Sequence, residues 1–368
     1  MHVFGVMDRG GAEVRTLALM RHVDPAHYVM EYIALSGNEG ALDDEIRSLG
    51  GEVHPCALDA TFPVRFVRLL HARRIGVVHS HVHLATGMIL GLAALAGVSV
   101  RIAHFRTTQD GRGDSPARRL YRRIMRMSID RFATDILACG VGAMEYGWSP
   151  DWRADPRCRV ILNGVDATRF DLPGQGAVVR QELSIPHDSP LVLIIGRFAP
   201  VKNHVRGIEI FSEIALRTGA HLLLAGKGGT AEEDLARRRV ASLGLEARVH
   251  FLGERDDVAS LLCAADLALL TSHHEGMPGA VLEAVAAGTP VLATDLPGVR
   301  EIQRCLDGIS TLSLADPDVA WAELACKLIG APRSDSSRRV ARSSFRASPF
   351  AIERSVEGHV DVWKQGRG

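Results

Sequence analysis

The sequence predicts an α/β protein built from two doubly wound parallel-sheet domains in tandem. Short apolar runs alternate with amphipathic helical patterns through residues 1–165, and the same alternation resumes at Leu191. This alternation is typical of parallel sheets whose strands are joined by right-handed helical crossovers. The length of 368 residues fits two such domains. Because ligands bind at the carboxyl ends of parallel strands, we expect the site in a cleft between the two domains.

Periodicity and helix terminators define the elements of the first series. Apolar residues at 14, 17, 18 and 20 give one helical face, and the glycine pair 50–51 is a natural stop for the next helix. The predicted strands are 3–7, 28–35, 52–55, 76–79, 99–104, 135–139 and 159–162, and the predicted helices are 13–23, 42–49, 64–74, 86–96 and 116–131.

The second series begins after a break in composition. Residues 166–190 contain Pro173, Gly174, Gly176, Pro186 and Pro190, which predicts a linker. Strands are then predicted at 191–196, 220–225, 249–252, 267–271 and 291–294, and helices at 204–218, 232–243, 258–264 and 279–287. Apolar residues from Ile352 to Trp363 recur at helical spacing. We therefore predict domains over 1–170 and 171–345, and a C-terminal helix over 346–368.

Composition excludes several classes of protein. Apolar residues make up 46% and charged residues 23%, which excludes wholesale disorder. Lys plus Arg and Asp plus Glu are both 43, and this balance argues against a nucleic-acid binder. The six cysteines form no CxxC pair, no signal peptide is recognisable, and the longest uncharged run, 84–100, falls short of a bilayer span. We expect a cytoplasmic protein with at most peripheral membrane contact.

The densest chemical signal is the segment 275–290, EGMPGAVLEAVAAGTP. It follows a predicted strand and opens a predicted helix, whose N-terminal N–H groups attract phosphate. Gly276 lets the backbone approach a ligand closely, and Pro278 fits a first helical turn. Glu275 and Glu283 can accept hydrogen bonds from sugar or ribose hydroxyls. An ordinary crossover with a solvated glutamate would explain the fold but not this combination.

Two further loops carry weaker signals. The segment 196–203, GRFAPVKN, places Arg197 and Lys202 after the first strand of the second series, and such cations suit a diphosphate. A surface pair of cations would look nearly the same. The loop 8–13, DRGGAE, follows the first strand, and Gly10 and Gly11 allow a turn close to a ligand. It is not a GxGxxG fingerprint, and alone it predicts only a strand-to-helix turn.

Together these segments resemble the retaining GT-B glycosyltransferases of family 4, and among them bacterial exopolysaccharide and capsule enzymes. The segment 160–166, VILNGVD, also matches the family, so the resemblance covers nearly the whole chain. It implies two Rossmann-like domains, with the acceptor on the N-terminal one and a nucleotide sugar on the C-terminal one. It also implies that the C-terminal helix over 346–368 crosses back to the N-terminal domain. It further implies donor binding by residues of four loops: Gly10, Gly11, Arg197, Lys202, Glu275, Gly276, Met277, Pro278 and Glu283. Among these it gives Arg197, Lys202 and Glu275 catalytic roles.

Histidines and an arginine mark two strand ends of the first series. His79, His81 and His83 alternate at strand spacing, as a metal face would, but no nearby acid or cysteine completes a ligand shell. We expect no metal. The resemblance places a histidine that faces the donor sugar at the end of the strand 99–104, and here either His104 or Arg106 takes that place. His81 and Arg106 are also candidates for the acceptor side.

The expected function is transfer of a hexosyl group, with retention, from a nucleotide sugar, which we expect to be UDP-linked, to an acceptor in cell-surface polysaccharide or glycoconjugate synthesis. The acceptor can be a sugar, a lipid-linked sugar or a small molecule, and no cofactor or metal is expected. The basic helix 116–131 can contact anionic lipid head groups. Alternatives are a transferase that tailors a secondary metabolite, a phosphorylase, and a nucleotide-sugar epimerase or binding protein on the same architecture.

Overall fold

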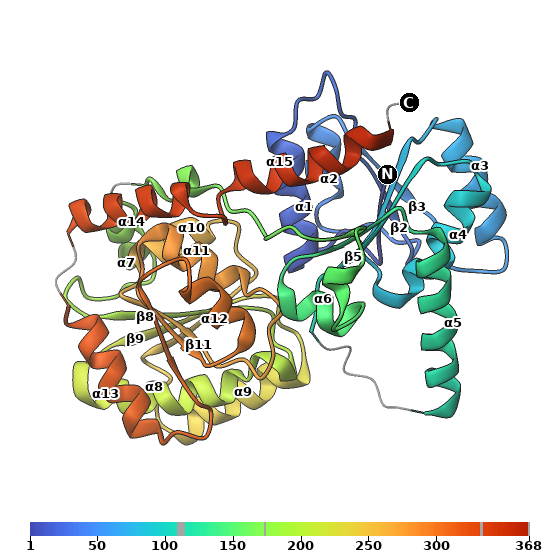
Figure 1. The fold of residues 1–368 in the computed structure, drawn as a ribbon. Coiled ribbons are helices and arrows are strands. Elements are labelled where there is room, and N and C mark those ends of the chain that lie inside the picture. Colours follow the sequence, from blue (N-terminus) through green and yellow to red (C-terminus); the bar gives the residue numbers. More distant parts are fainter. Residues whose placement is uncertain (109–114, 173, 332–333, 367–368) are drawn as a thin grey trace. The chain divides into compact units, whose positions relative to one another are not determined.

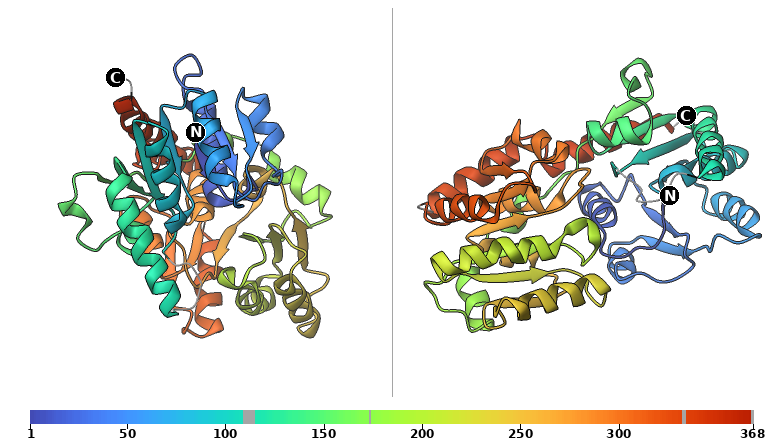
Figure 2. Two further views of the ribbon diagram at one scale, coloured as in Figure 1. Left: turned by 90° about the vertical axis from the view of Figure 1, so that its right-hand side faces the viewer. Right: turned by 90° about the horizontal axis from the view of Figure 1, so that it is seen from below.

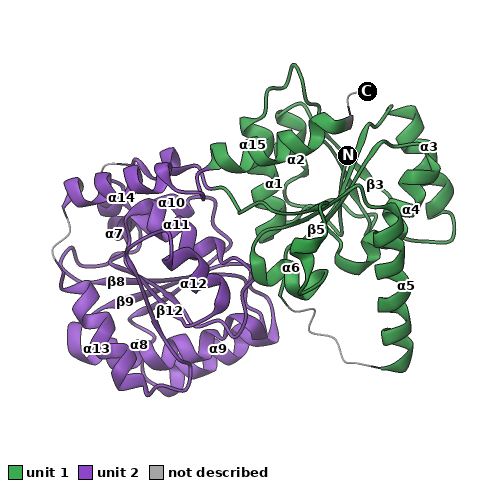
Figure 3. Ribbon diagram, in the orientation of Figure 1, with its two compact units in different colours: residues 1–164, 352–368 green, residues 165–351 purple. Residues whose placement is uncertain are grey.

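The computed structural model describes residues 1–108, 115–172, 174–331 and 334–366. Each of its two compact units has its own parallel sheet, as Figures 1 and 2 show. Unit 1 consists of residues 1–164 and 352–368, and unit 2 of residues 165–351 (Figure 3).

The sheet of unit 1 has seven strands in the order β3-β2-β1-β4-β5-β6-β7, and every neighbouring pair is parallel. The order reverses beside β1, which has β2 on one side and β4 on the other. Such a reversal is where doubly wound sheets bind ligands. The strands are β1 (His2–Phe4), β2 (Glu31–Ala34), β3 (Glu52–Pro55), β4 (Val77–Ser80), β5 (Val100–Phe105), β6 (Asp135–Ala138) and β7 (Cys158–Val160).

Helices cover both faces of this sheet (Figure 1). They are α1 (Gly11–His22), α2 (Asp43–Ser48), α3 (Phe62–Ala72), α4 (Thr86–Leu95), α5 (Pro116–Phe132), α6 (Val141–Gly147) and the C-terminal α15 (Ile352–Trp363). The core between sheet and helices contains Tyr32, Ile102 and Leu137, all fully buried, and Trp363 of α15 joins it. The last helix of the chain is therefore part of the first unit.

The sheet of unit 2 has six parallel strands in the order β10-β9-β8-β11-β12-β13. Here the order reverses between β8 and β11. The strands are β8 (Leu191–Ile195), β9 (His221–Ala225), β10 (Val249–Gly253), β11 (Leu267–Leu270), β12 (Val291–Thr294) and β13 (Ile309–Leu312). Apolar residues fill β8 and β11 because both faces of the sheet are covered.

The helices of unit 2 lie in two layers, with α8, α9 and α13 on one face of the sheet and α7, α10, α11 and α14 on the other (Figure 1). Their bounds are α7 (Gln175–Glu182), α8 (His204–Thr218), α9 (Ala231–Ser242), α10 (Val258–Ala264), α11 (Gly279–Ala287), α12 (Pro297–Gln303), α13 (Asp318–Ile329) and α14 (Asp335–Ala347). Trp321 of α13 is fully buried against α8 and the sheet.

The predicted linker 166–190 is corrected by the structure, because α7 lies inside it and Val179 is buried. The positive φ of Gly174 allows the turn that starts this helix. The sequence prediction also omitted α6, α12, β13, α13 and α14.

The unit boundaries lie a few residues from the predicted domain boundaries. The carbonyl of Phe170 accepts hydrogen bonds from Cys263 and Arg342, which places it in unit 2. At the other end, the backbone of Val165 bonds to Phe350, so the residues after 345 stay with unit 2 until Ala351.

In the part of the chain that the structure describes, no helix combines the length and the apolar character needed to cross a bilayer.

Candidate functional site

Two loops meet at the carboxyl edge of the unit 2 sheet, where the strand order reverses. One follows β8 and the other follows β11, its neighbour in the sheet. The backbone N–H of His273 donates to the carbonyl of Val201 at 2.8 Å, and Thr271 Oγ1 donates to the carbonyl of Asn203 at 3.0 Å. Asn203 has a positive φ of 52°, which turns the chain from the first loop into α8. The backbone thus fixes the two loops relative to each other.

Lys202 and Glu275 form an ion pair across these loops. Lys202 Nζ lies 2.7 Å from Glu275 Oε1, and Ser272 Oγ donates to the same oxygen at 2.8 Å. Both charged side chains are largely buried, with 22% and 13% of their surface exposed. An ammonium carries three donors, and Glu275 takes one of those on Lys202, so the amine can also serve an anion. A cation and an acid that the sequence predicts on two separate loops are thus brought together.

Two glycines let neighbouring loops approach at this edge. A Cβ on Gly226, after β9, would lie 2.1 Å from the carbonyl oxygen of Gly196, and a Cβ on Gly298 would lie 2.3 Å from that of Gly276. Real Cβ atoms do not come this close to backbone. Only glycine therefore fits at these two positions. The glycine at 298 allows the loop that carries Gly276 to lie against the start of α12.

The loop after β11 leads into α11, whose N-cap is Pro278. Met277 and Pro278 are buried, and Glu283 is half-buried in the second turn. The first N–H groups of α11 have no partner within the helix, and the helix dipole favours negative charge there. The predicted acids thus lie on one strand–loop–helix unit, as the sequence indicates.

Arg197 is exposed, and among the described residues its guanidinium makes no hydrogen bond or ion pair. Its neighbour Phe198 stacks on His204, the first residue of α8, with ring centroids 4.2 Å apart. Burial, together with the charge of Lys202, lowers the pKa of His204 to about 4, so this ring is neutral at neutral pH. The neutral His204 ring therefore stabilises the loop by packing on Phe198.

A second group of polar side chains lies at the carboxyl edge of the unit 1 sheet. The turn with Gly10 and Gly11 follows β1, and Glu13 folds back against it, so a Cβ on Gly10 would meet Glu13 Oε2 at 2.2 Å. His81 and Arg106 follow β4 and β5, the next two strands in the sheet.

Arg106 is held by three neutral acceptors. Nε donates to His81 Nδ1 at 3.1 Å, Nη1 to Asn163 Oδ1 at 3.1 Å, and Nη2 lies 3.4 Å from His104 Nδ1. His104 is 1% exposed, while His81 and Arg106 are half-buried. Of the two candidates at the end of β5, Arg106 is therefore the one that a ligand can reach.

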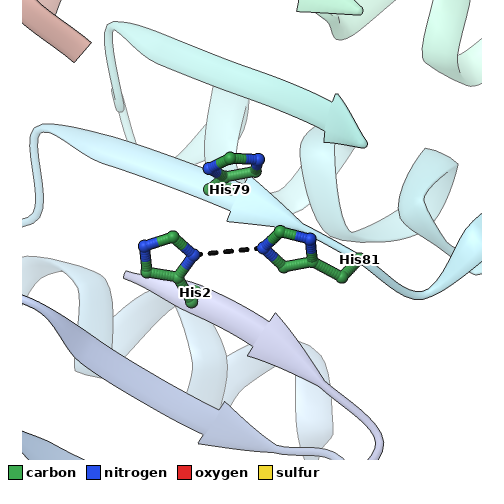
Figure 4. A group of neighbouring side chains, drawn as sticks. All are labelled: His2, His79 and His81. Atoms are coloured by element: carbon green, nitrogen blue, oxygen red, sulfur yellow. Dashed lines mark hydrogen bonds between the residues drawn. The ribbon is translucent and has the colours of Figure 1, made fainter. Parts of the chain in front are cut away.

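Five histidines gather around this arginine, and burial lowers the pKa of each ring: His2, His79, His81, His104 and His359. Two triplets have ring nitrogens within 4.8 Å of one another, His2 with His79 and His81 (Figure 4), and His79 with His104 and His359. Their geometry alone would allow a metal ion.

The guanidinium assigns the tautomers, because arginine only donates. His81 Nδ1 and His104 Nδ1 accept from it, so each neutral ring carries its proton on Nε2. His81 Nε2 then donates to His2 Nδ1 at 3.1 Å.

The same reasoning fixes His79. Because His104 Nδ1 is an acceptor, His79 Nε2 donates to it at 2.9 Å, and His79 Nδ1 accepts from the Trp363 indole at 3.4 Å. His359 donates from Nδ1 to a backbone carbonyl, which leaves its Nε2 lone pair. Neither triplet offers three lone pairs to a metal without breaking this network.

Sequence reasoning missed four residues that shape the two edges: Ser272, Gly298, Asn163 and His204. Ser272 lies three residues before Glu275, a spacing at which a hydroxyl commonly reaches a neighbouring acceptor. Asn163 stands in the quoted segment 160–166 but was given no role. Gly298 approaches the carbonyl of Gly276 on another loop, and His204 packs on Phe198 of its own loop, and neither contact follows from a pattern in the sequence.

Two family models together match most of the chain. Residues 10–178 match the model described as Glycosyl transferase 4-like domain, and residues 177–339 match the model described as Glycosyl transferases group 1.

Curated relatives match over most of their own length. EpsF of Bacillus subtilis (strain 168), named a glycosyltransferase, is 29% identical over 374 residues, 99% of this chain and 95% of that protein. The capsular polysaccharide biosynthesis glycosyltransferase CapH of Staphylococcus aureus is 26% identical over 89% of this chain and 90% of its own. The lipopolysaccharide core biosynthesis glycosyltransferase LpsE of Rhizobium meliloti (strain 1021) is 32% identical over 69% of this chain and 67% of its own.

Solved structures share the fold. The crystal structure of Anabaena Alr3699/HepE in complex with UDP superposes with a TM-score of 0.81 at 18% identity and covers 99% of both chains. The same protein in complex with UDP and glucose gives a TM-score of 0.80, also at 18% identity, over 99% of this chain and 98% of that one.

Proposed function

The chain belongs to the family 4 glycosyltransferases of GT-B fold, and from this premise we propose that it moves a hexosyl group from a UDP-linked sugar to an acceptor in cell-surface polysaccharide synthesis, with retention at the anomeric carbon. The roles named for CapH in capsular polysaccharide and for LpsE in lipopolysaccharide core biosynthesis support the polysaccharide assignment. The UDP and glucose named with the Anabaena neighbour support the donor.

The Lys202–Glu275 pair at the switch point of unit 2 carries the proposal. The ammonium faces the diphosphate of the donor, and the carboxylate accepts hydrogen bonds from hydroxyls of the donor sugar. The ion pair makes Glu275 a poor nucleophile, because the charge of the carboxylate is already compensated by Lys202. The pair is suited to binding and orientation.

Negative charge grows on the diphosphate as the bond to the sugar breaks. Three features supply the compensating positive charge: the free guanidinium of Arg197, the ammonium of Lys202 and the N–H groups at the start of α11. Preorganised donors of this kind lower the barrier by electrostatic stabilisation of the transition state. Glu283 binds the ribose, and Gly10 and Gly11 approach the donor in the same proposal.

We place the acceptor on unit 1, at the edge that carries His81 and Arg106. We also propose that α5 contacts an anionic lipid surface. Leu120, Ile124 and Met127 are 59%, 50% and 63% exposed at the spacing of one helical face. Arginines at 119, 123 and 126 stand beside them and are also exposed. This combination of apolar and basic faces is typical of interfacial helices.

Analysis of the products by proton NMR tests the proposal. The donors are UDP-, GDP- and dTDP-sugars, and the anomeric configuration is read from the product of transfer or slow hydrolysis. We expect retention, and an inverted product would contradict it. The assay contains EDTA, and turnover should persist because the proposed chemistry needs no metal. Loss of turnover in EDTA with recovery on adding a divalent ion would refute the metal-free mechanism.

A further inference from the structure

Arg106 is a half-buried cation whose hydrogen-bond partners are all neutral side chains. It follows β5, and its three bonds go to two imidazoles and one amide oxygen. The tautomers assigned above leave both imidazoles uncharged. Within the residues that the structure describes, no carboxylate lies within 4.0 Å of its guanidinium. A cation in such surroundings has lost hydration without gaining a counter-charge.

The charges that act on Arg106 from further away do not replace a partner. Glu13 contributes negative charge and Arg15 positive charge, so their effects oppose each other. Burial lowers the pKa of Arg106 to about 10, which still leaves the group charged at neutral pH. The edge of the sheet therefore presents a fixed and uncompensated positive charge.

Counting donors shows what this charge can bind. A guanidinium has five N–H groups, and His81 and Asn163 each accept from one of them. A third N–H, on Nη2, lies 3.4 Å from His104 Nδ1, whose single lone pair it shares with the closer His79. One N–H remains on each of the two terminal nitrogens. A pair of donors in this fork matches the two oxygens of one carboxylate or phosphate group.

The side chains around Arg106 hold its guanidinium in one orientation. His81 and His104 are oriented by His2 and His79, and Trp363 of α15 donates to His79. Strands β1, β4 and β5 and the C-terminal helix thus combine to orient one side chain. A network of this size preorganises the guanidinium, which reduces the entropy lost on binding.

We propose that Arg106 binds an oxyanion on the acceptor, a carboxylate or a phosphate group, and so selects an acidic acceptor. The inference rests on the proposed function, since that assigns the donor diphosphate to Arg197 and Lys202 and the acceptor to unit 1. A neutral sugar can accept hydrogen bonds from these donors but supplies no counter-charge, so it binds less tightly at this edge.

Calorimetric titration of the full chain tests this. The probes are methyl β-glucuronide, methyl β-glucoside and inorganic phosphate, and UDP is titrated separately. The variants are Arg106→Gln, Arg106→Lys and Lys202→Ala. The control is Arg101→Gln, at the opposite end of β5, where the guanidinium donates to the backbone carbonyls of Val98 and Phe132.

We expect the wild type and the Arg101→Gln and Lys202→Ala variants to bind the glucuronide at least tenfold more tightly than the glucoside. Arg106→Gln should abolish this preference, and Arg106→Lys should keep part of it, because a lysine retains the charge but not the fork. Inorganic phosphate should bind the Lys202→Ala variant as the glucuronide does, because this variant lacks the cation of unit 2 but keeps Arg106. The folding of each variant is checked by thermal unfolding.

Equal binding of the glucuronide by the wild type and Arg106→Gln would overturn the inference, as would the absence of any preference in the wild type. Loss of UDP binding in Arg106→Gln with no effect on the glucuronide would assign the guanidinium to the donor instead, which also overturns it. Failure of UDP, GDP and dTDP to bind the wild type would contradict the proposed function. The glucuronide titrations would still decide whether Arg106 binds an oxyanion.

Discussion

At the scale of single residues, the central feature is a charge pair whose two members come from different loops. Lys202 and Glu275 are 73 positions apart, and the parallel pairing of β8 with β11 brings them to 2.7 Å. Sequence reasoning could identify both residues, because each follows an apolar strand and stands among glycine or proline. It could not predict that they pair with each other, since that depends on strand order.

Glu275→Gln tests the charge of this acid without changing its size. The amide can still accept from Ser272, but it no longer balances Lys202. We expect transfer to fall by about 10²-fold, of the order found when one oriented polar group is removed from an active site. Steady-state kinetics measures this. The matched control is Glu323→Gln on the exposed face of α13, which should leave the rate unchanged.

Gly226→Ala tests the contact between the loops after β8 and β9. The added methyl group would lie 2.1 Å from a backbone oxygen, so the loops must separate. We expect unit 2 to lose about 2–4 kcal/mol of stability, within the range for overpacked or strained sites. Urea unfolding measures this loss. Gly176→Ala is the control, because its new methyl group would have only ordinary contacts and a helix favours alanine.

At the scale of secondary-structure elements, the sequence predicted the strands and most helices that build the two edges. The helix 279–287 was predicted with the bounds that the structure has. The glycines and prolines around α7 flank a short helix, which packs on α10 and forms the ion pairs Arg180–Asp266 and Glu182–Arg255 with other parts of unit 2. These distant contacts are not visible in the local sequence. Helix α14 begins with a Ser334 capping box, a local signal that was available but not used.

The basic face of α5 gives a prediction about lipid. Its C-terminal half packs on α4, where Ser128 Oγ donates to the carbonyl of Gly87 at 2.6 Å, while residues nearer its start are exposed. Leu120→Gln with Ile124→Gln should greatly reduce sedimentation with vesicles of 30% phosphatidylglycerol in phosphatidylcholine, and vesicles of phosphatidylcholine alone should bind weakly. Leu216→Gln, on an exposed face of α8, is the control. If the double variant sediments as the wild type does, α5 is not the contact.

The packing of α15 gives a prediction about pH. His359 is 2% exposed, and burial lowers its pKa to about 3 from an ordinary value of 6.5. The unfolded chain therefore binds more protons between these values, and stability falls as the pH drops below 6.5. Between these two pKa values, each such imidazole lowers the free energy of unfolding by about 1.4 kcal/mol for every unit by which the pH falls.

Urea unfolding at pH 7, 6 and 5 measures this dependence. His359→Leu should flatten it by about 1.4 kcal/mol per pH unit, since one proton is no longer taken up. The control is His187→Leu on the surface. A variant whose stability falls as steeply as that of the wild type would show that His359 is not one of the titrating groups.

At the scale of the whole molecule, the division into two sheets follows from the alternation of strands and helices. The return of the last helix to the first unit was expected from the family resemblance alone, because an amphipathic pattern does not say which core the helix covers. Trp363 settles this by packing beside Tyr28 and donating to His79. The strand spacing of 79, 81 and 83 holds only for His79 on β4, because His81 follows that strand and His83 begins a 3-10 helix. The hydrogen bonds among the histidines depend on the strand order β1-β4-β5, which the sequence does not predict.

The claim on which the whole account depends is that unit 2 holds a nucleoside diphosphate through Lys202. The direct measurement is calorimetric titration of UDP, GDP and dTDP into the wild type, Lys202→Ala and the control Lys327→Ala, whose lysine is exposed on α13. We predict that at least one nucleotide binds the wild type and Lys327→Ala equally, and that Lys202→Ala weakens it by at least tenfold. Equal affinity in all three proteins, or no binding to the wild type, would contradict the account.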